Sequence, residues 1–348
     1  MATLDYQRRL RNLETRRFDN ELNESAVSAA YRSTTAPQNI RYLLESMMPI
    51  DVKYNNRTIE AAQRVQNHLE NGLQVHFTRA YRTQGSVITK TNIKVHSDFD
   101  LLGIIDRYYY SQTSSGNEWK GSVPDEDIRE YRKQATAILK GIYHEVDTTN
   151  EKCISIFNKS LNRKVDVVFA FWYNSDKYEA EHNEYYRGIY LYKFPNGPKQ
   201  RDYPFAHMHQ VNAKGEETAD GSRRAVRLLK TLKADCETDL GRLKSFQLTA
   251  VVHSMESTRL RYYLANDLTL ATETSEQIRK ILEDSTYRKS IKSPNGIEYP
   301  LASDDVVPLL SRLQEDLDEL IADASRELNS QVVRNAVQAY GSPTVLRG

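Results

Sequence analysis

The chain has 348 residues and a mass of 40.2 kDa, which is enough for two domains or for one domain with an added lobe. Its 48 Lys and Arg residues nearly balance its 47 Asp and Glu residues. The resulting formal net charge of +1 argues against a protein that binds DNA or RNA through a large overall positive charge. Two cysteines and the lack of a long uncharged apolar run exclude a disulfide framework and a membrane span, and they favour a reducing cytoplasm.

Two periodicities divide the first part of the chain into helices and strands. Apolar residues four positions apart, such as Ala61, Val65 and Leu69, predict helices, and alternating apolar residues predict strands. The predicted helices cover residues 1–33, 39–48, 58–73 and 125–143. The predicted strands cover residues 75–81, 153–158, 163–173 and 188–193, with further strand territory over 87–106.

From Asp202 onward the sequence predicts helices, and its acidic stretch 315–327 is typical of a solvated helix face. The predicted helices cover residues 221–235, 245–255, 258–267, 271–284 and 304–328, with a polar loop over 285–300. We therefore expect an α+β fold. Residues 1–204 would hold N-terminal helices and a mixed α/β core, and residues 205–348 would form a helical lobe, with the boundary in the Pro- and Gly-rich stretch Phe194–Pro204.

Two aspartates stand two positions apart in the segment Ser97–Leu101. Residues i and i+2 of a strand share a face, so Asp98 and Asp100 are expected to project to one side while Phe99 and Leu101 enter the core. A pair of this kind, taken alone, is also typical of a solvated strand end.

A third aspartate, Asp166, lies inside the apolar run Val165–Phe169. A carboxylate in such surroundings needs a partner, because an isolated buried charge is costly. Three carboxylates on adjacent strands would form an all-oxygen site that suits Mg²⁺. Two such ions would hold the attacking and leaving oxygens of a phosphoryl or nucleotidyl transfer. A hydrogen bond to a backbone amide is the alternative role for Asp166.

The segment Gln84-Gly85-Ser86 follows a predicted strand and precedes the aspartate pair. Glycine lets the backbone approach a phosphate closely, and serine adds an amide and a hydroxyl that bind phosphate oxygens. Thr89 and Thr91 add further hydroxyls. A Gly-Ser pair alone predicts only a turn, but Gly-Ser, Asp-x-Asp and a strand aspartate in this order form a much more specific pattern.

This order of motifs resembles the polymerase-β-type nucleotidyltransferase superfamily. More narrowly, the segments QGSVITKTNI, SDFD and KVDVVFAF are similar to those of the cGAS/DncV-like nucleotidyltransferases of bacteria, which make cyclic oligonucleotide messengers in anti-phage (CBASS) systems. The resemblance continues through Asp202-Tyr203-Pro204, His207, Asn212 and SRRAVRLLKTLK, and it covers residues 60–260. It implies a polymerase-β-like nucleotidyltransferase core with a small mixed sheet, an α-helical C-terminal lobe, and nucleotides in the cleft between them. Lys90 departs from the small residue that many members carry there.

Residues 221–233 carry five basic side chains and no acidic one. At 100° per residue, Arg223, Arg227 and Lys230 fall on one helix face and the leucines fall on the other. This predicts one face that packs and one that meets anions, with a solvated basic face as the alternative. The aromatic Phe246 either stacks on a nucleobase or belongs to the core of its helix.

The resemblance implies an enzyme that joins two or more NTPs, ATP among them, into a cyclic di- or trinucleotide that acts on a downstream effector. Asp98 and Asp100 would bind the Mg²⁺ ion that holds the donor triphosphate, with Mn²⁺ as an alternative metal. Asp166 would help a second ion activate the acceptor ribose hydroxyl, which attacks the α-phosphorus and releases pyrophosphate. The implied nucleotide-binding residues are Gln84, Gly85, Ser86, Thr91, Lys230, Ser245 and Phe246.

Two other functions use the same residues. A template-independent RNA-tailing or oligoadenylate polymerase needs the same three carboxylates, although the net charge of +1 gives little support for an RNA path. An inactive nucleotide-binding sensor or scaffold is the alternative of another class, and the presence of all three carboxylates and of Gly-Ser counts against it.

The C-terminal residues after Tyr340 are expected to form an exposed tail, because Gly341 and Pro343 break helices. In the family that the chain resembles, some operons encode ubiquitin-transfer-like enzymes that conjugate the synthase through its C-terminal residue. The resemblance therefore makes Gly348 a candidate conjugation point. A frayed end without a role is the alternative.

Overall fold

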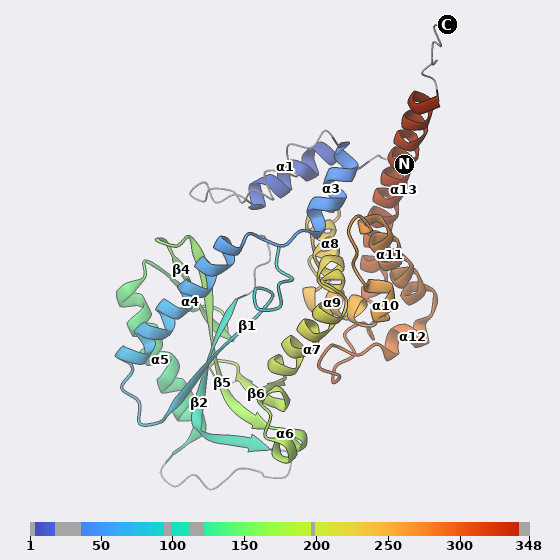
Figure 1. The fold of residues 1–348 in the computed structure, drawn as a ribbon. Helices are drawn as coiled ribbons and strands as arrows, with labels where there is room; N and C mark the ends of the chain where they lie inside the picture. Colours follow the sequence, from blue (N-terminus) through green and yellow to red (C-terminus); the bar gives the residue numbers. More distant parts are fainter. Residues whose placement is uncertain (1–3, 18–35, 94–98, 112–121, 196–198, 341–348) are drawn as a thin grey trace, which may run out of the picture. The chain divides into compact units, whose positions relative to one another are not determined.

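The computed structural model describes residues 4–17, 36–93, 99–111, 122–195 and 199–340 (Figure 1), and its contacts divide the chain into two units. The sheet unit comprises residues 50–213 and 294–297, and the helical unit comprises residues 1–49, 214–293 and 298–348. The predicted α+β class is confirmed. The division differs from the predicted one at residue 204, because the N-terminal helices group with the helical unit rather than with the sheet.

The sheet unit contains one mixed sheet and the helices that flank it (Figure 1). In chain order its elements are α4 (Val52–Gly72), β1 (Arg79–Gln84), β2 (Asp100–Ser111), α5 (Pro124–Ile142), β3 (Glu145–Asp147), β4 (Cys153–Asn158), β5 (Arg163–Asn174), α6 (Asp176–Glu181), the 3₁₀ turn η1 (Glu184–Tyr186), β6 (Arg187–Tyr192), β7 (Lys199–Asp202) and the first part of α7 (Pro204–Glu217).

Strand β5 organises this sheet. The strand order is β1-β2-β5-β4-β3. In addition, β6 pairs with the second half of β5, and β7 pairs with β6. β2 and β5 are parallel, and the other strand pairs are antiparallel. The first half of β5 pairs with β4 and its second half pairs with β6 along the same edge, while β2 pairs along the other edge, so this one strand has three partner strands.

The two faces of the sheet are covered differently. Alternate residues of the central strands, such as Leu101, Val167 and Phe169, pack with apolar residues of α4 and α5 in one buried cluster, and Figure 1 shows both helices on the same side of the sheet. The other face holds a smaller cluster that includes Val168 and is extended by Phe205 at the start of α7. Polar side chains near the strand ends project from this second face of the sheet.

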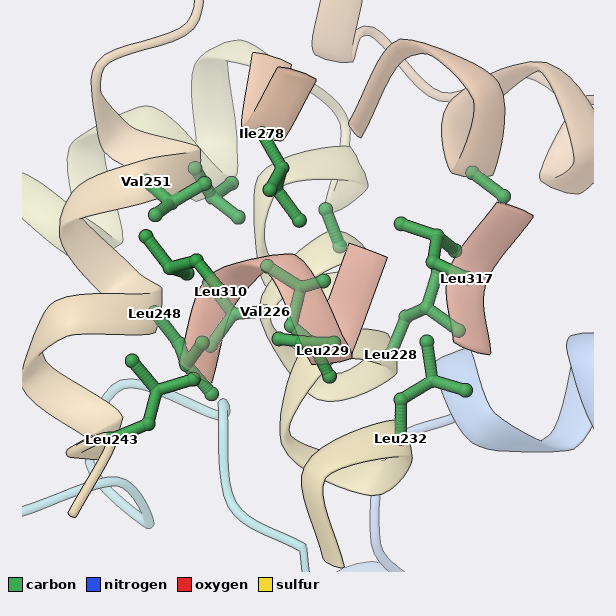
Figure 2. Packing of buried hydrophobic residues seen from close by; sticks show 14 of the residues in the cluster. Val226, Leu228, Leu229, Leu232, Leu243, Leu248, Val251, Ile278, Leu310 and Leu317 are labelled. Atoms are coloured by element: carbon green, nitrogen blue, oxygen red, sulfur yellow. The ribbon is translucent and has the colours of Figure 1, made fainter. Parts of the chain in front are cut away.

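The helical unit packs around α8 (Figure 2). Its elements are α1 (Tyr6–Arg17), α3 (Gln38–Met47), the end of α7, α8 (Gly221–Asp235), α9 (Ser245–His253), α10 (Ser257–Leu260), α11 (Asp267–Glu283), α12 (Ser285–Ser290) and α13 (Val306–Tyr340). Figure 2 shows apolar side chains of α8, α9, α11 and α13 in one cluster, among them Val226, Leu229, Val251, Ile278, Leu310 and Leu317.

The N-terminal helix α1 binds to the acidic stretch of α13. Arg9 of α1 forms an ion pair with Asp316, and both side chains are 1% exposed. Tyr6 donates a hydrogen bond from its hydroxyl to Asp323 Oδ2 at 2.7 Å. The predicted solvated face over 315–327 is therefore wrong at these two aspartates, which instead bind the N-terminal residues to the helical unit.

Three further sequence predictions need correction. The predicted loop 285–300 contains α12, which Asp284 caps by accepting a hydrogen bond from Tyr287 N. The last helix runs to Tyr340 rather than ending at residue 328. The first strand begins only at Arg79. Across the described ranges, no helix has both the length and the apolar character that crossing a membrane requires.

Candidate active site

A polar row crosses four strands of the sheet. Asp100 of β2 lies opposite Asp166 of the parallel strand β5. Gln84 of β1 lies opposite Asp100, and Ser155 of β4 lies opposite Asp166. Residues that are paired in register share a face of the sheet, so these four side chains project to the same side. The expectation that Leu101 enters the core is confirmed, since it is fully buried on the opposite face.

Gln84 and Lys164 contact the aspartates of this row. Gln84 Nε2 donates a hydrogen bond to Asp100 Oδ2 at 2.8 Å. Lys164 Nζ donates a hydrogen bond to Asp166 Oδ2 at 3.3 Å, so the partner that the sequence required for Asp166 is present. Even so, Asp166 Oδ1 is buried and accepts no hydrogen bond from any residue that the structure describes.

The donor chemistry of this row fits Mg²⁺. Two carboxylates on adjacent strands, one with a buried oxygen that accepts no hydrogen bond among the described residues, provide the oxygen ligands that this ion prefers. The third expected ligand, Asp98, lies outside the described residues. No cluster of three metal-ligating side chains occurs in the described part of the chain.

The thiol of Cys153 lies close enough to the polar row to be influenced by its two carboxylates. Its thiol lies on β4 with Sγ 3.8 Å from Ser155 Oγ. Burial raises the pKa of the Cys153 thiol, and the carboxylates of Asp166 and Asp100 raise this pKa further. The row therefore has the negative potential that attracts a cation. Sequence analysis missed Cys153 and Ser155, because only the register between β4 and β5 brings them beside Asp166.

The segment after β1 is a hydrogen-bonded turn rather than the predicted strand. Gly85 O accepts a hydrogen bond from Ile88 N at 3.2 Å, and Ser86 O accepts one from Thr91 N at 2.9 Å. Gly85 has φ 118°, a conformation that favours glycine. The turn begins at the residue after Gln84, so its first backbone N–H groups lie next to the polar row, where a phosphate would need them.

The hydroxyls of this turn hold its own backbone. Thr89 Oγ1 lies 2.9 Å from Thr91 Oγ1 and donates to Ser86 O at 3.3 Å. Thr91 is buried, so the structure gives it a role in the loop, and nucleotide binding by Thr91 stays a prediction. Lys90, where the sequence departs from the family pattern, has φ 57° in the left-handed region, which is uncommon for a residue other than glycine.

We expect Gly85→Ala to destabilise the protein by about 1–3 kcal/mol, because alanine is strained at φ 118°. Urea unfolding measures this change. The matched control is Gly141→Ala in α5, where an added Cβ has open space, and we expect it to leave stability unchanged or to raise it. Equal effects of the two substitutions would contradict the strain at Gly85.

The basic face of α8 is buried, so the alternative of a solvated basic face is wrong. Its arginines meet carboxylates of the chain itself, and nucleotide binding by Lys230 stays a prediction. Arg223 is 4%, Arg227 0% and Lys230 2% exposed. Arg227 donates to Met47 O and to Asp220 Oδ2, each at 2.7 Å. Helical periodicity separates the arginines from the leucines, but it does not reveal that α3 and the turn before α8 cover the arginine side.

The last two predicted site residues open α9. Ser245 is the first residue of this helix, and both Ser245 and Phe246 are half-buried, so Phe246 is not part of a fully buried core. Lys230, Ser245 and Phe246 belong to the helical unit, whereas the polar row belongs to the sheet unit. Their nucleotide-binding roles stay predictions.

Comparison with known proteins identifies similar chains, although no family model matches. A c-di-GMP synthase of Lachnospiraceae bacterium (strain RUG226) is 30% identical over 289 residues, which cover 73% of this chain and 80% of the relative. The cyclic dinucleotide synthase CdnE of Yersinia aleksiciae is 27% identical over 301 residues, covering 84% and 78%. The solved structure of a STING-associated CdnE c-di-GMP synthase from Capnocytophaga granulosa aligns with a TM-score of 0.78 at 28% identity, covering 92% of this chain and 98% of that one.

Proposed function

Because the chain belongs to the cGAS/DncV-like nucleotidyltransferases and is a cyclic dinucleotide synthase of that family, we propose that its substrate is GTP and its product cyclic di-GMP. Two GTP molecules are joined through two ribose–phosphate bonds, and two pyrophosphates leave. The base choice is supported by the relative that is 30% identical and by the structural neighbour that is 28% identical, since both are c-di-GMP synthases.

The polar row supplies the chemistry in this proposal, and the pairing of Asp100 with Asp166 is the observation that carries it. Gln84 orients the Asp100 carboxylate through its hydrogen bond. The backbone N–H groups at the start of the Gly85 turn bind oxygens of the donor triphosphate. Two Mg²⁺ ions, or Mn²⁺ in their place, held by Asp100, Asp166 and Asp98, would neutralise the triphosphate and lower the pKa of the acceptor hydroxyl. Catalysis then rests largely on position and charge.

The test is incubation of the purified protein with Mg²⁺ and with GTP alone, ATP alone or both. A phosphatase-resistant product with the mass of cyclic di-GMP, formed from GTP alone, is the expected result. A product that needs both nucleotides overturns the base choice. A ladder of lengths would show a polymerase instead, and binding of GTP without turnover would show a sensor or scaffold.

The downstream partner follows from the product. The structural neighbour from Capnocytophaga granulosa is described as STING-associated, so the proposed partner is an effector that binds cyclic di-GMP, in the cytoplasm. Gly348 lies outside the described residues, and its conjugation stays a prediction. Deleting the last four residues should leave synthesis unchanged and abolish conjugation in a reconstituted operon.

A further inference from the structure

We propose that the sheet unit has a second, non-catalytic site for an anionic ligand of nucleotide size, beside α5. A cavity of about 470 Å³ lies between α5, the loop 148–151 and the segment Phe194-Pro195. Small-molecule sites in proteins typically have volumes of about 300–1,000 Å³, with apolar walls and a few polar groups. This cavity has the size of such a site, and its walls consist wholly of residues of the sheet unit.

One buried arginine, Arg132, holds together the segments that line the cavity. Arg132 is 9% exposed, and its guanidinium donates to Thr148 O at 3.0 Å, to Asn150 O at 2.7 Å and to Glu151 O at 3.1 Å. The guanidinium carbon lies 4.4 Å from the ring centre of Phe194. These contacts fix the loop and the ring against α5, so the cavity is preformed. Within the described part of the chain, no carboxylate pairs with Arg132.

The remaining polar groups of the cavity are mostly donors. Arg129 and Lys133 stand four positions apart on α5, where such residues share a face. Within the described ranges the hydroxyls of Thr136 and Thr148 make no hydrogen bond. Among the described lining residues, Glu151 supplies the one carboxylate, which lies 3.7 Å from Lys193 Nζ.

The excess of cationic side chains over carboxylates in the cavity indicates that its ligand is an anion. Among the described lining residues three cationic side chains accompany one carboxylate. The pairs of Glu151 with Lys193 and of Lys133 with Glu130 are both partly exposed and contribute little, so positive charge prevails. Arginine, lysine and hydroxyl donors together are suited to phosphate oxygens. The volume exceeds what inorganic phosphate needs, and the Phe194-Pro195 wall offers an apolar surface for the rest of an organic phosphate.

The cavity is separate from the polar row. The Phe194 ring contacts Phe169 of β5 at 6.0 Å between ring centres, and Phe169 belongs to the face of the sheet that α4 and α5 cover. Asp166 projects to the other face. A ligand beside α5 therefore needs neither the aspartates nor their metal.

The test is calorimetric titration of the full chain with GMP in EDTA, with guanosine and inorganic phosphate as parallel probes. We expect GMP to bind, guanosine not to bind, and phosphate to bind more weakly than GMP. Arg129→Ala/Lys133→Ala should lower the GMP affinity at least tenfold, because it removes two charged donors. Lys140→Ala, an exposed lysine of the same helix, is the matched control and should leave the affinity unchanged.

Two further measurements locate the site. Asp100→Asn should bind GMP as wild type does, and hydrogen exchange should show protection by GMP in residues 129–151. Loss of binding in Asp100→Asn would assign the GMP to the polar row and overturn the proposal. No binding by wild type, equal binding by Arg129→Ala/Lys133→Ala, or phosphate binding as tight as GMP binding would overturn it as well.

Discussion

Asp100→Asn is expected to lower the rate of dinucleotide synthesis by roughly a thousandfold or more, because a carboxylate that holds the metals accounts for several kcal/mol of transition-state stabilisation. Asparagine has the same shape and can still accept the hydrogen bond from Gln84. The fold should therefore remain, and thermal stability should hold or rise, since one of two facing negative charges is removed. Initial rates with Mg²⁺ and melting temperatures in EDTA measure the two effects.

A control on the same sheet separates catalysis from general damage. Asp147 of β3 is exposed and accepts hydrogen bonds from Thr149. It pairs with Ser155 at the far end of the polar row, three strands away from Asp100. We expect Asp147→Asn to retain the wild-type rate. If Asp100→Asn also retained it, the assignment of Asp100 to the metals would be wrong, whatever the effect on stability.

Arg9→Ala is expected to destabilise the helical unit by about 3–5 kcal/mol, because it leaves the Asp316 carboxylate in a buried position without this arginine. Asp316 keeps its second partner, Arg312, at 2.6 Å, which places the expected cost toward the lower end of that range. Chemical unfolding measures the loss, and hydrogen exchange in α1 and α13 should rise.

The neighbouring residue provides the control for this prediction. Arg8 pairs with Glu237 at the surface, so Arg8→Ala should change stability by only about 0–1 kcal/mol. Replacing both buried partners, as in Arg9→Met/Asp316→Leu, should recover most of the stability, since apolar side chains need no charge partner. A loss in Arg8→Ala as large as that in Arg9→Ala would mean that the buried ion pair is not what holds α1.

The parts of the site that sequence could predict are those that depend on one strand or one turn. The alternation of side chains along a strand predicted that Leu101 is buried while Asp100 projects to the other face. The apolar neighbours of Asp166 predicted that its carboxylate has a partner. Ser155 could not be found in this way, because its place beside Asp166 depends on the register between two strands. Register depends on pairing across the whole sheet, which a local pattern does not contain.

The errors share a related cause. The acidic stretch 315–327 was predicted to be solvated and the basic face of α8 to meet anions, but Asp316 and Arg227 are both buried by elements far away in sequence. Periodicity tells which side chains share a face, and it does not tell whether another helix covers that face. The strand predicted from Val87 onward was wrong for a different reason: Val87 and Ile88 are β-branched residues that favour strands, whereas Gly85 and Lys90 have the positive φ of a turn.

The parallel pairing of β2 with β5 also has a consequence for the order of folding. The antiparallel pair β4–β5 is joined by a short connection, so it can form early. Asp100 and Asp166 become neighbours only when β2 joins β5, which requires closing a loop of about 65 residues, and such long closures are slow. The antiparallel strand pairs therefore form before the reactive centre, and we expect catalytic competence to appear during refolding later than the secondary structure seen by circular dichroism.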